Sequence, residues 1–185
     1  VFQHCPLLRD SVSYSAPLAC ENMVQSLEKL DLLHLKGRWA LVAGSLNDSA
    51  DAAVLKESDS ITLVFDNFTY TQVTRLGDTC KYYPLNISME GGILTFKTGI
   101  YNFTGIFLQT TCTDCAVLKL DIKSPNLKSL DVYLFSRRRE LEQKEMDDFR
   151  AQVACLNMPP PILMDPTKEL CPDHSETQGV DAQET

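Results

Sequence analysis

The stretch LKGRWALVAGS, residues 35–45, places a glycine, a cation and the only tryptophan of the chain ahead of an alternating segment. Gly37 precedes Arg38 and Trp39, and bulky and small residues then follow one another. Alternation of this kind is typical of a β-strand with one buried face. We therefore expect a first strand that begins at Gly37 and has Trp39 at its mouth.

The alternating pattern continues to about Phe135. The segments SITLVF, FTYTQVT, GGILTFKTG, TGIFLQTT, AVLKLDI and SLDVYLF follow it, and turn residues such as Gly77-Asp78 and Gly91-Gly92 lie between them. About eight short strands at this spacing predict an all-β, antiparallel sandwich or closed barrel. A closed barrel of about eight strands is wide enough to hold one small ligand.

The segments around these strands predict a single domain. Residues 1–19 show no periodicity and are expected to form an irregular arm, and residues 20–36 predict a short helix or turn. Residues 136–156 predict a helix capped by Ser136. The apolar stripe of this helix consists of Leu141, Met146, Phe149 and Val153. Residues 173–185 are polar and acidic and are expected to be disordered, which leaves residues 20–172 as the folded domain.

The charge balance argues against a nucleic-acid partner. The chain carries 17 Lys and Arg against 25 Asp and Glu, a formal net charge of −8, and its only basic run is residues 137–139. No apolar run approaches the roughly 18 residues that a membrane span needs, so we expect no membrane insertion. We expect a monomer.

Seven cysteines and four N-x-S/T sequons predict a secreted, extracellular glycoprotein. The sequons begin at Asn47, Asn67, Asn86 and Asn102. We expect the chain to be a mature form whose leader has been removed. The odd number of cysteines leaves one thiol free or paired with another molecule.

The sequence contains no pattern that predicts catalysis, a metal or a cofactor. The C-x-x-C spacing of Cys112 and Cys115 suits redox or zinc chemistry, but no second pair of cysteines or histidines lies nearby. We favour a local Cys112–Cys115 disulfide at a hairpin turn, with a bond from Cys5 to one of them as the alternative. We therefore predict neither an enzyme nor a metalloprotein.

Several segments together resemble a known family. GRWALVAGS, DTCKYYPLNISMEGGIL, SLDVYLFSRR, VACLNMP and KELCPDH are similar to lipocalins of the alpha-1-acid glycoprotein and apolipoprotein M branch. Within that branch the chain is most similar to the fish tributyltin-binding proteins and the pufferfish saxitoxin- and tetrodotoxin-binding proteins. The resemblance spans residues 20–172 and implies an eight-stranded, up-and-down antiparallel barrel, the lipocalin calyx, with one C-terminal α-helix.

The resemblance also implies how the barrel is held together. Trp39 would plug its closed end, and Arg137, Arg138 or Arg139 would stack on the indole in a cation–π contact of roughly 1 kcal/mol. Gly37, Trp39 and Arg138 are accordingly assigned structural roles.

Two disulfides follow from the same resemblance. They are Cys20–Cys155, from the entry segment to the helix end, and Cys80–Cys171, from the barrel to the tail. Closing loops this long contributes on the order of 3 to 5 kcal/mol.

By resemblance, the protein would be a carrier in plasma that sequesters a small toxin or xenobiotic in its barrel, for transport or detoxification. The ligand would be a guanidinium toxin such as tetrodotoxin or saxitoxin, or an organotin. A lipid carrier of the apolipoprotein M kind is the alternative. A prostaglandin-synthase-like enzyme needs a thiol inside the barrel near the first strand, and no cysteine occurs between residues 21 and 79. An immune modulator that binds proteins through its surface is a further alternative.

Alternation, with its phase set by the resemblance, predicts which side chains point into the barrel. The predicted ligand-binding residues are Leu41, Tyr70, Gln72, Leu85, Phe96, Thr98, Leu118, Leu120, Asp131, Tyr133 and Phe135. Ala43, Ser45, Leu94 and Ala116 are expected on the same inward faces.

Asp131 is the unusual member of this set because a carboxylate is costly to desolvate in an apolar cup. In one interpretation it lies wet at the open rim and has no role. In another it receives a cationic ligand such as a guanidinium, with the rings of Tyr70 and Tyr133 nearby. In a third, the predicted phase of its strand is wrong. An organotin would instead prefer a thiolate, for which Cys5 is the candidate.

Overall fold

The computed structural model describes residues 16–173, with side chains from Cys20 onward. Most of the predicted N-terminal arm, with Cys5, and the predicted acidic tail from residue 174 lie outside the described residues. The arm is not irregular throughout, because helix α1 (Ala16–Met23) begins within it.

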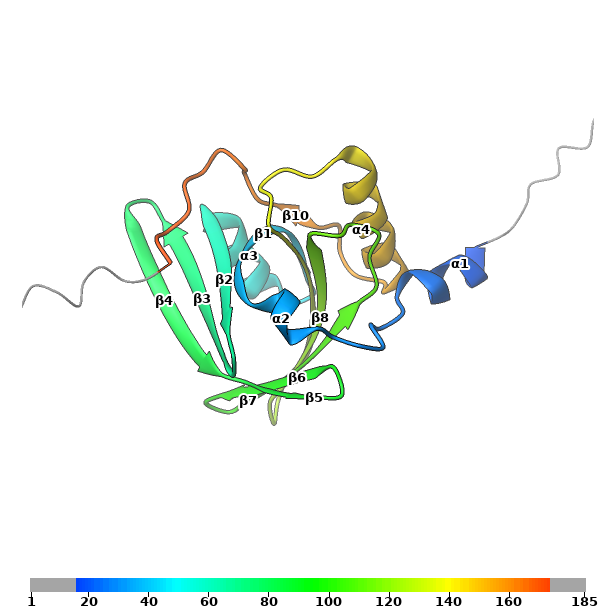
Figure 1. Ribbon diagram of the computed structural model, residues 1–185, viewed down its shortest axis with the longest axis horizontal. Coiled ribbons are helices and arrows are strands. Elements are labelled where there is room, and N and C mark those ends of the chain that lie inside the picture. The colour runs from blue at the N-terminus through cyan, green and yellow to red at the C-terminus, as the bar shows by residue number, and fades with distance from the viewer. Residues whose placement is uncertain (1–15, 174–185) are drawn as a thin grey trace, which may run out of the picture.

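An antiparallel sheet winds into a nearly closed barrel (Figure 1). Its strands are β1 (Gly37–Leu46), β2 (Ser60–Asp66), β3 (Thr69–Leu76), β4 (Thr79–Asn86), β5 (Ser88–Glu90), β6 (Ile93–Thr98), β7 (Tyr101–Leu108), β8 (Cys115–Lys123) and β9 (Lys128–Ser136). They pair in the order β4-β3-β2-β1-β9-β8-β7-β6-β5, and the short β10 (Ile162–Leu163) pairs with β1. The order is up-and-down, as expected.

This pairing order includes nine strands rather than the expected eight. The pairing is interrupted at Ile87, the single residue between β4 and β5, whose side chain is buried in the barrel core. Because Ile87 turns into the core, the extended backbone is interrupted there. The segment therefore forms two strands, β4 and β5, where the alternating pattern predicts one. The chain itself therefore connects the two end strands of the sheet.

Trp39 fills one end of the barrel and is only 1% exposed. Its indole Nε1 donates to the carbonyl of Leu35 at 2.8 Å, in the short helix α2 (Leu32–Leu35). The guanidinium of Arg137 lies 3.8 Å above the ring and donates to the carbonyl oxygens of residues 34, 36 and 38. Gly37 has φ of +99°, and a Cβ there would lie 3.4 Å from Arg137. The stacking arginine is thus Arg137, not Arg138.

A bulge in β1 changes which of its side chains face inward. The register against β9 shifts between Leu41 and Ala43, so Val42 is an extra residue. Ala43 joins a second core outside the barrel, and the hydroxyl of Ser45 donates to the carbonyl of Pro159. The prediction that Ala43 and Ser45 face inward is therefore wrong, because one inserted residue reverses the alternation.

The second core lies under helix α4 (Gln143–Cys155), which packs Phe149 and Val153 against the outside of the barrel. The helix begins at Gln143, later than predicted. Ser136 is still the last residue of β9, and Glu142 forms a capping box with Glu145. None of the helices in residues 16–173 is long and apolar enough to cross a membrane.

Helix α3 (Ser49–Glu57) is absent from the sequence prediction. Asp48 caps it by accepting hydrogen bonds from the backbone N–H groups of Ala50 and Asp51. Strand β1 leads from α2 to α3, and its ten residues span about 33 Å. The two helices therefore lie at opposite ends of the barrel, and each contributes a leucine, Leu35 or Leu55, to the barrel core.

Three disulfides are present in the described part of the chain. Cys20–Cys155 joins α1 to the end of α4, and Cys80–Cys171 joins β4 to the C-terminal segment, as the resemblance implied. The third is the local Cys112–Cys115 bond.

We predict that Arg137→Gln lowers the free energy of unfolding by about 1 to 2 kcal/mol, because it removes the cation–π contact and the bonds to three carbonyls. Urea unfolding followed by Trp39 fluorescence measures the change. Lys128→Gln, at the other end of β9, is the matched control and is expected to leave stability within about 0.5 kcal/mol. Equal losses in both variants would contradict the role given to Arg137.

Candidate functional site

The barrel encloses a cavity of about 490 Å³. Its walls come from β1–β4, β6–β9 and α3. Eleven of the lining residues are those predicted from the sequence to bind a ligand: Leu41, Tyr70, Gln72, Leu85, Phe96, Thr98, Leu118, Leu120, Asp131, Tyr133 and Phe135. The structure brings all of these side chains together, and their part in binding stays a prediction.

Other lining residues are absent from the predicted set: Leu46, Asp51, Val54, Leu55, Ser58, Ile61, Leu63, Phe65, Thr74, Tyr83, Phe103 and Ile122; Leu94, expected on an inward face, also lines the cavity. The inward face of β2 was visible as alternation but was not assigned to the cavity. One feature of the sequence could have predicted helix α3, which contributes to the cavity wall: Asp48 is a favourable cap residue ahead of an alanine-rich segment.

Aromatic rings make up a continuous part of the wall. Phe65 stacks on Tyr70 with ring centroids 5.5 Å apart, and Tyr70 meets Phe96 edge-on at 5.6 Å. Phe96 in turn stacks on Phe103 at 4.4 Å. Each such pair contributes about 0.5 to 1.5 kcal/mol beyond the area it buries, so contacts among the rings themselves stabilise this wall.

Asp131 is the polar group set most deeply into this wall. It lies on β9 in register with Leu46 of β1 and Leu120 of β8, and it is only 3% exposed. The Tyr133 hydroxyl donates to its Oδ2 at 2.8 Å, whereas Oδ1 is buried without any hydrogen-bond partner. Asp131 is therefore buried rather than wet, and its side chain lines the cavity, as the predicted phase of its strand requires.

The electrostatics of the cavity follow from this burial. Desolvation raises the pKa of Asp131 to about 6, against the hydrogen bond from Tyr133, and the carboxylates of Asp51 and Asp48 raise it further. Burial, together with the neighbouring Asp131, also places the pKa of Tyr133 well above its usual value. Among the lining residues that the structure describes, two are acidic and none is Lys, Arg or His.

We predict that Asp131→Asn stabilises the ligand-free protein at neutral pH. The folded-state pKa of Asp131 lies above its unfolded value near 3.8, so the folded state loses stability as the pH rises from about 4 to about 6. Above that window the cost is complete and amounts to no more than about 3 kcal/mol. Urea unfolding at several pH values is expected to show a gain for the variant at pH 7.5 that vanishes near pH 4. An equal gain in stability at every pH would contradict the raised pKa of Asp131.

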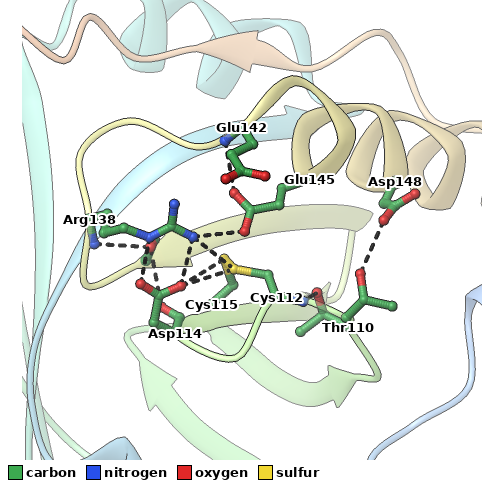
Figure 2. Close-up of polar contacts among 10 residues, drawn as sticks. Thr110, Cys112, Asp114, Cys115, Arg138, Glu142, Glu145 and Asp148 are labelled. Carbon is green, nitrogen blue, oxygen red and sulfur yellow. Dashed lines mark hydrogen bonds and ion pairs between the residues drawn. A yellow bond between two sulfur atoms is a disulfide. The ribbon is translucent and has the colours of Figure 1, made fainter.

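A second polar cluster lies outside the barrel, around the Cys112–Cys115 disulfide (Figure 2). Arg138 binds both carboxylate oxygens of Asp114, at 2.6 and 2.9 Å, and one oxygen of Glu145 at 2.8 Å. This arginine lowers the pKa of both acids and ties the loop before β8 to α4.

The Cys112–Cys115 disulfide determines whether this cluster can bind a metal ion. One donor atom each from Cys112, Asp114 and Cys115 lies within 4.8 Å of the others, which is close enough for a shared metal ion. Sulfurs joined in a disulfide offer no thiolate as a ligand. The cluster gives Arg138 a different role from the predicted contact with Trp39, because it holds the loop before β8 against α4.

All four sequon asparagines are exposed. The Oδ1 of Asn47 accepts hydrogen bonds from the hydroxyl of Ser129 and from the backbone N–H of Leu130. Glycosylation stays a prediction.

The chain superposes on the solution NMR structure of lipocalin 12 from rat epididymis with a TM-score of 0.68, over 80% of this chain and 91% of that one. The chain has a lipocalin fold. At 17% sequence identity the likeness is one of fold, and the branch of the family inferred from sequence stays a prediction. No known family profile and no curated protein matches the sequence.

Proposed function

We propose that this protein is a secreted carrier that encloses a small toxin or xenobiotic in its barrel. The observation that supports this proposal is the preformed cavity of about 490 Å³, which lies within the range of sites that bury a drug-sized molecule. Its walls are largely apolar and aromatic, and a few polar groups converge on one part of them. Affinity then comes from buried apolar area, and orientation from the polar groups.

Within this class, a guanidinium toxin such as tetrodotoxin or saxitoxin fits the cavity better than an organotin. The guanidinium group is a planar cation with several N–H donors, and Asp131 has an unsatisfied acceptor. An organotin prefers a soft ligand such as a thiolate, and the described lining contains neither cysteine nor histidine.

A lipid is the second candidate ligand, favoured by the long aromatic stretch from Phe65 to Phe103. An alkyl tail would lie against these rings without needing Asp131. The two candidates differ in an observable way, because a lipid carrier is expected to release lipid when the purified protein is extracted and analysed by mass spectrometry.

The test is calorimetric titration of tetrodotoxin into two tryptophan variants of β3. Gln72 lines the cavity, so Gln72→Trp fills part of it and is expected to weaken binding at least about tenfold. Thr71, its neighbour on the same strand, is not among the lining residues, so Thr71→Trp is expected to bind like the native chain.

Equal binding by both variants would place the toxin outside the cavity. If tetrodotoxin does not bind and extracted lipid is found, the lipid carrier replaces the toxin carrier. If neither ligand is found, the carrier proposal itself fails.

A further inference from the structure

We infer that ligands enter and leave the barrel through its side, between the unpaired edges of β4 and β6, and that the stacked rings of Phe96 and Phe103 are the gate of this passage. The inference rests on the proposed carrier function. It adds the route of ligand exchange and the residues that control its rate.

The first observation is a side seam in the sheet, where two strand edges have no partner. In residues 16–173, β4 pairs along one edge only, with β3. Strand β6 pairs with β7 along its whole length but with β5 only through Ile93–Thr95, so residues 96–98 have no strand partner on that side. Because no ladder of hydrogen bonds joins β4 to β6, these edges separate more easily than paired strands do.

The second observation is a hollow outside the barrel that shares part of its lining with the cavity. The hollow measures about 610 Å³ and lies at the side seam, with Asn86 at the end of β4, Ser88 on β5 and Lys97 on β6. Phe96 and Phe103 line both this hollow and the barrel cavity. At this point two rings with centroids 4.4 Å apart therefore separate the cavity from the outside.

The third observation is the exposure of the cavity wall next to the side seam. Tyr83 of β4 lines the cavity, yet it is 48% exposed. Tyr70 and Phe96 line the same cavity and are each only 8% exposed. Tyr83 is the fifth of the eight residues of β4, away from both ends of the strand. Its exposure therefore comes from the unpaired edge of β4, so the cavity wall is open to solvent there.

Both ends of the barrel, by contrast, are occupied by side chains of its core. At one end Trp39 is buried under Arg137, which bonds to three carbonyl oxygens. At the other end α3 lines the cavity and buries Leu55 in the barrel core. The Phe96–Phe103 pair has no hydrogen bond to break, so its rings can turn aside at the cost of their apolar contacts alone.

The experiment follows the exchange of a neutral fluorescent probe, N-phenyl-1-naphthylamine, by stopped flow. A gate changes the barrier between the free and bound states but not the states themselves, so it changes the association and dissociation rates by the same factor and leaves Kd unchanged. Gln72→Trp, which fills part of the cavity, is expected to weaken binding of the probe and so to place it inside the barrel.

The first pair of variants fills the hollow or leaves it free. Lys97 lines the hollow but not the cavity, so Lys97→Trp is expected to slow both rates at least about fivefold with Kd unchanged. Lys123 is exposed on β8 and is not among the residues that line the hollow. Lys123→Trp is therefore the matched control and is expected to exchange the probe like the native chain.

The second pair of variants tests the gate and the competing route. Phe103→Leu keeps an apolar side chain but removes one ring of the stack, so it is expected to speed both rates at least about threefold. Val54 is 61% exposed on α3 and lines the cavity at the other end. Val54→Trp adds bulk there and is expected to leave both rates unchanged.

The outcomes separate this inference from the proposed function. If Val54→Trp slows exchange and Lys97→Trp does not, the route lies at the α3 end and the inference is overturned. Equal slowing by both variants, or slowing by neither, would overturn it as well, and in each case the carrier function stands because the probe still binds. If the probe does not bind the native chain, the carrier proposal fails together with the inference.

Discussion

The pairing of β1 with β9 joins the two halves of the sheet, and the rest of the molecule depends on it. These two strands are far apart in the sequence, and Arg137 fixes them at one end by covering Trp39 and binding carbonyls at the start of β1. The same pairing places Gly44 beside Tyr133 and Leu46 beside Asp131 near the other end. One strand pair therefore carries both the plug of the barrel and the buried carboxylate of the cavity wall.

The sequence was sufficient to predict most of the fold. Alternating residues identified nearly every strand, since each has one face toward the core and one away from it, and this is a local property that a short segment displays. The resemblance supplied the two long disulfides and the order of strands. The predictions that failed depend on tertiary packing: the bulge at Val42, the break at Ile87 and the choice of Arg137 among three adjacent arginines.

The cavity was predictable in its outline, and less so in its detail. Inward positions on β3, β6, β8 and β9 followed from alternation, whereas α3 did not because its nine residues carry little amphipathic pattern. Periodicity also could not show that Asp131 is nearly inaccessible to water with one oxygen unpaired, or that a glycine on a neighbouring strand makes room for Tyr133. Such properties arise from the meeting of segments distant along the chain.

The bulge at Val42 divides β1 into two halves whose side chains alternate in opposite phase. Before the bulge Trp39 fills the plugged end and Leu41 lines the cavity, and after the bulge Leu46 lines the same chamber. Without the extra residue, Ala43 and Ser45 would face the chamber in place of Gly44 and Leu46, and the ring of Tyr133 would lose its space. The inserted residue thus uncouples the two halves in evolutionary terms: substitutions beyond it can retune the contents of the chamber while the sequence around Gly37 and Trp39, which keeps the barrel closed, remains as it is.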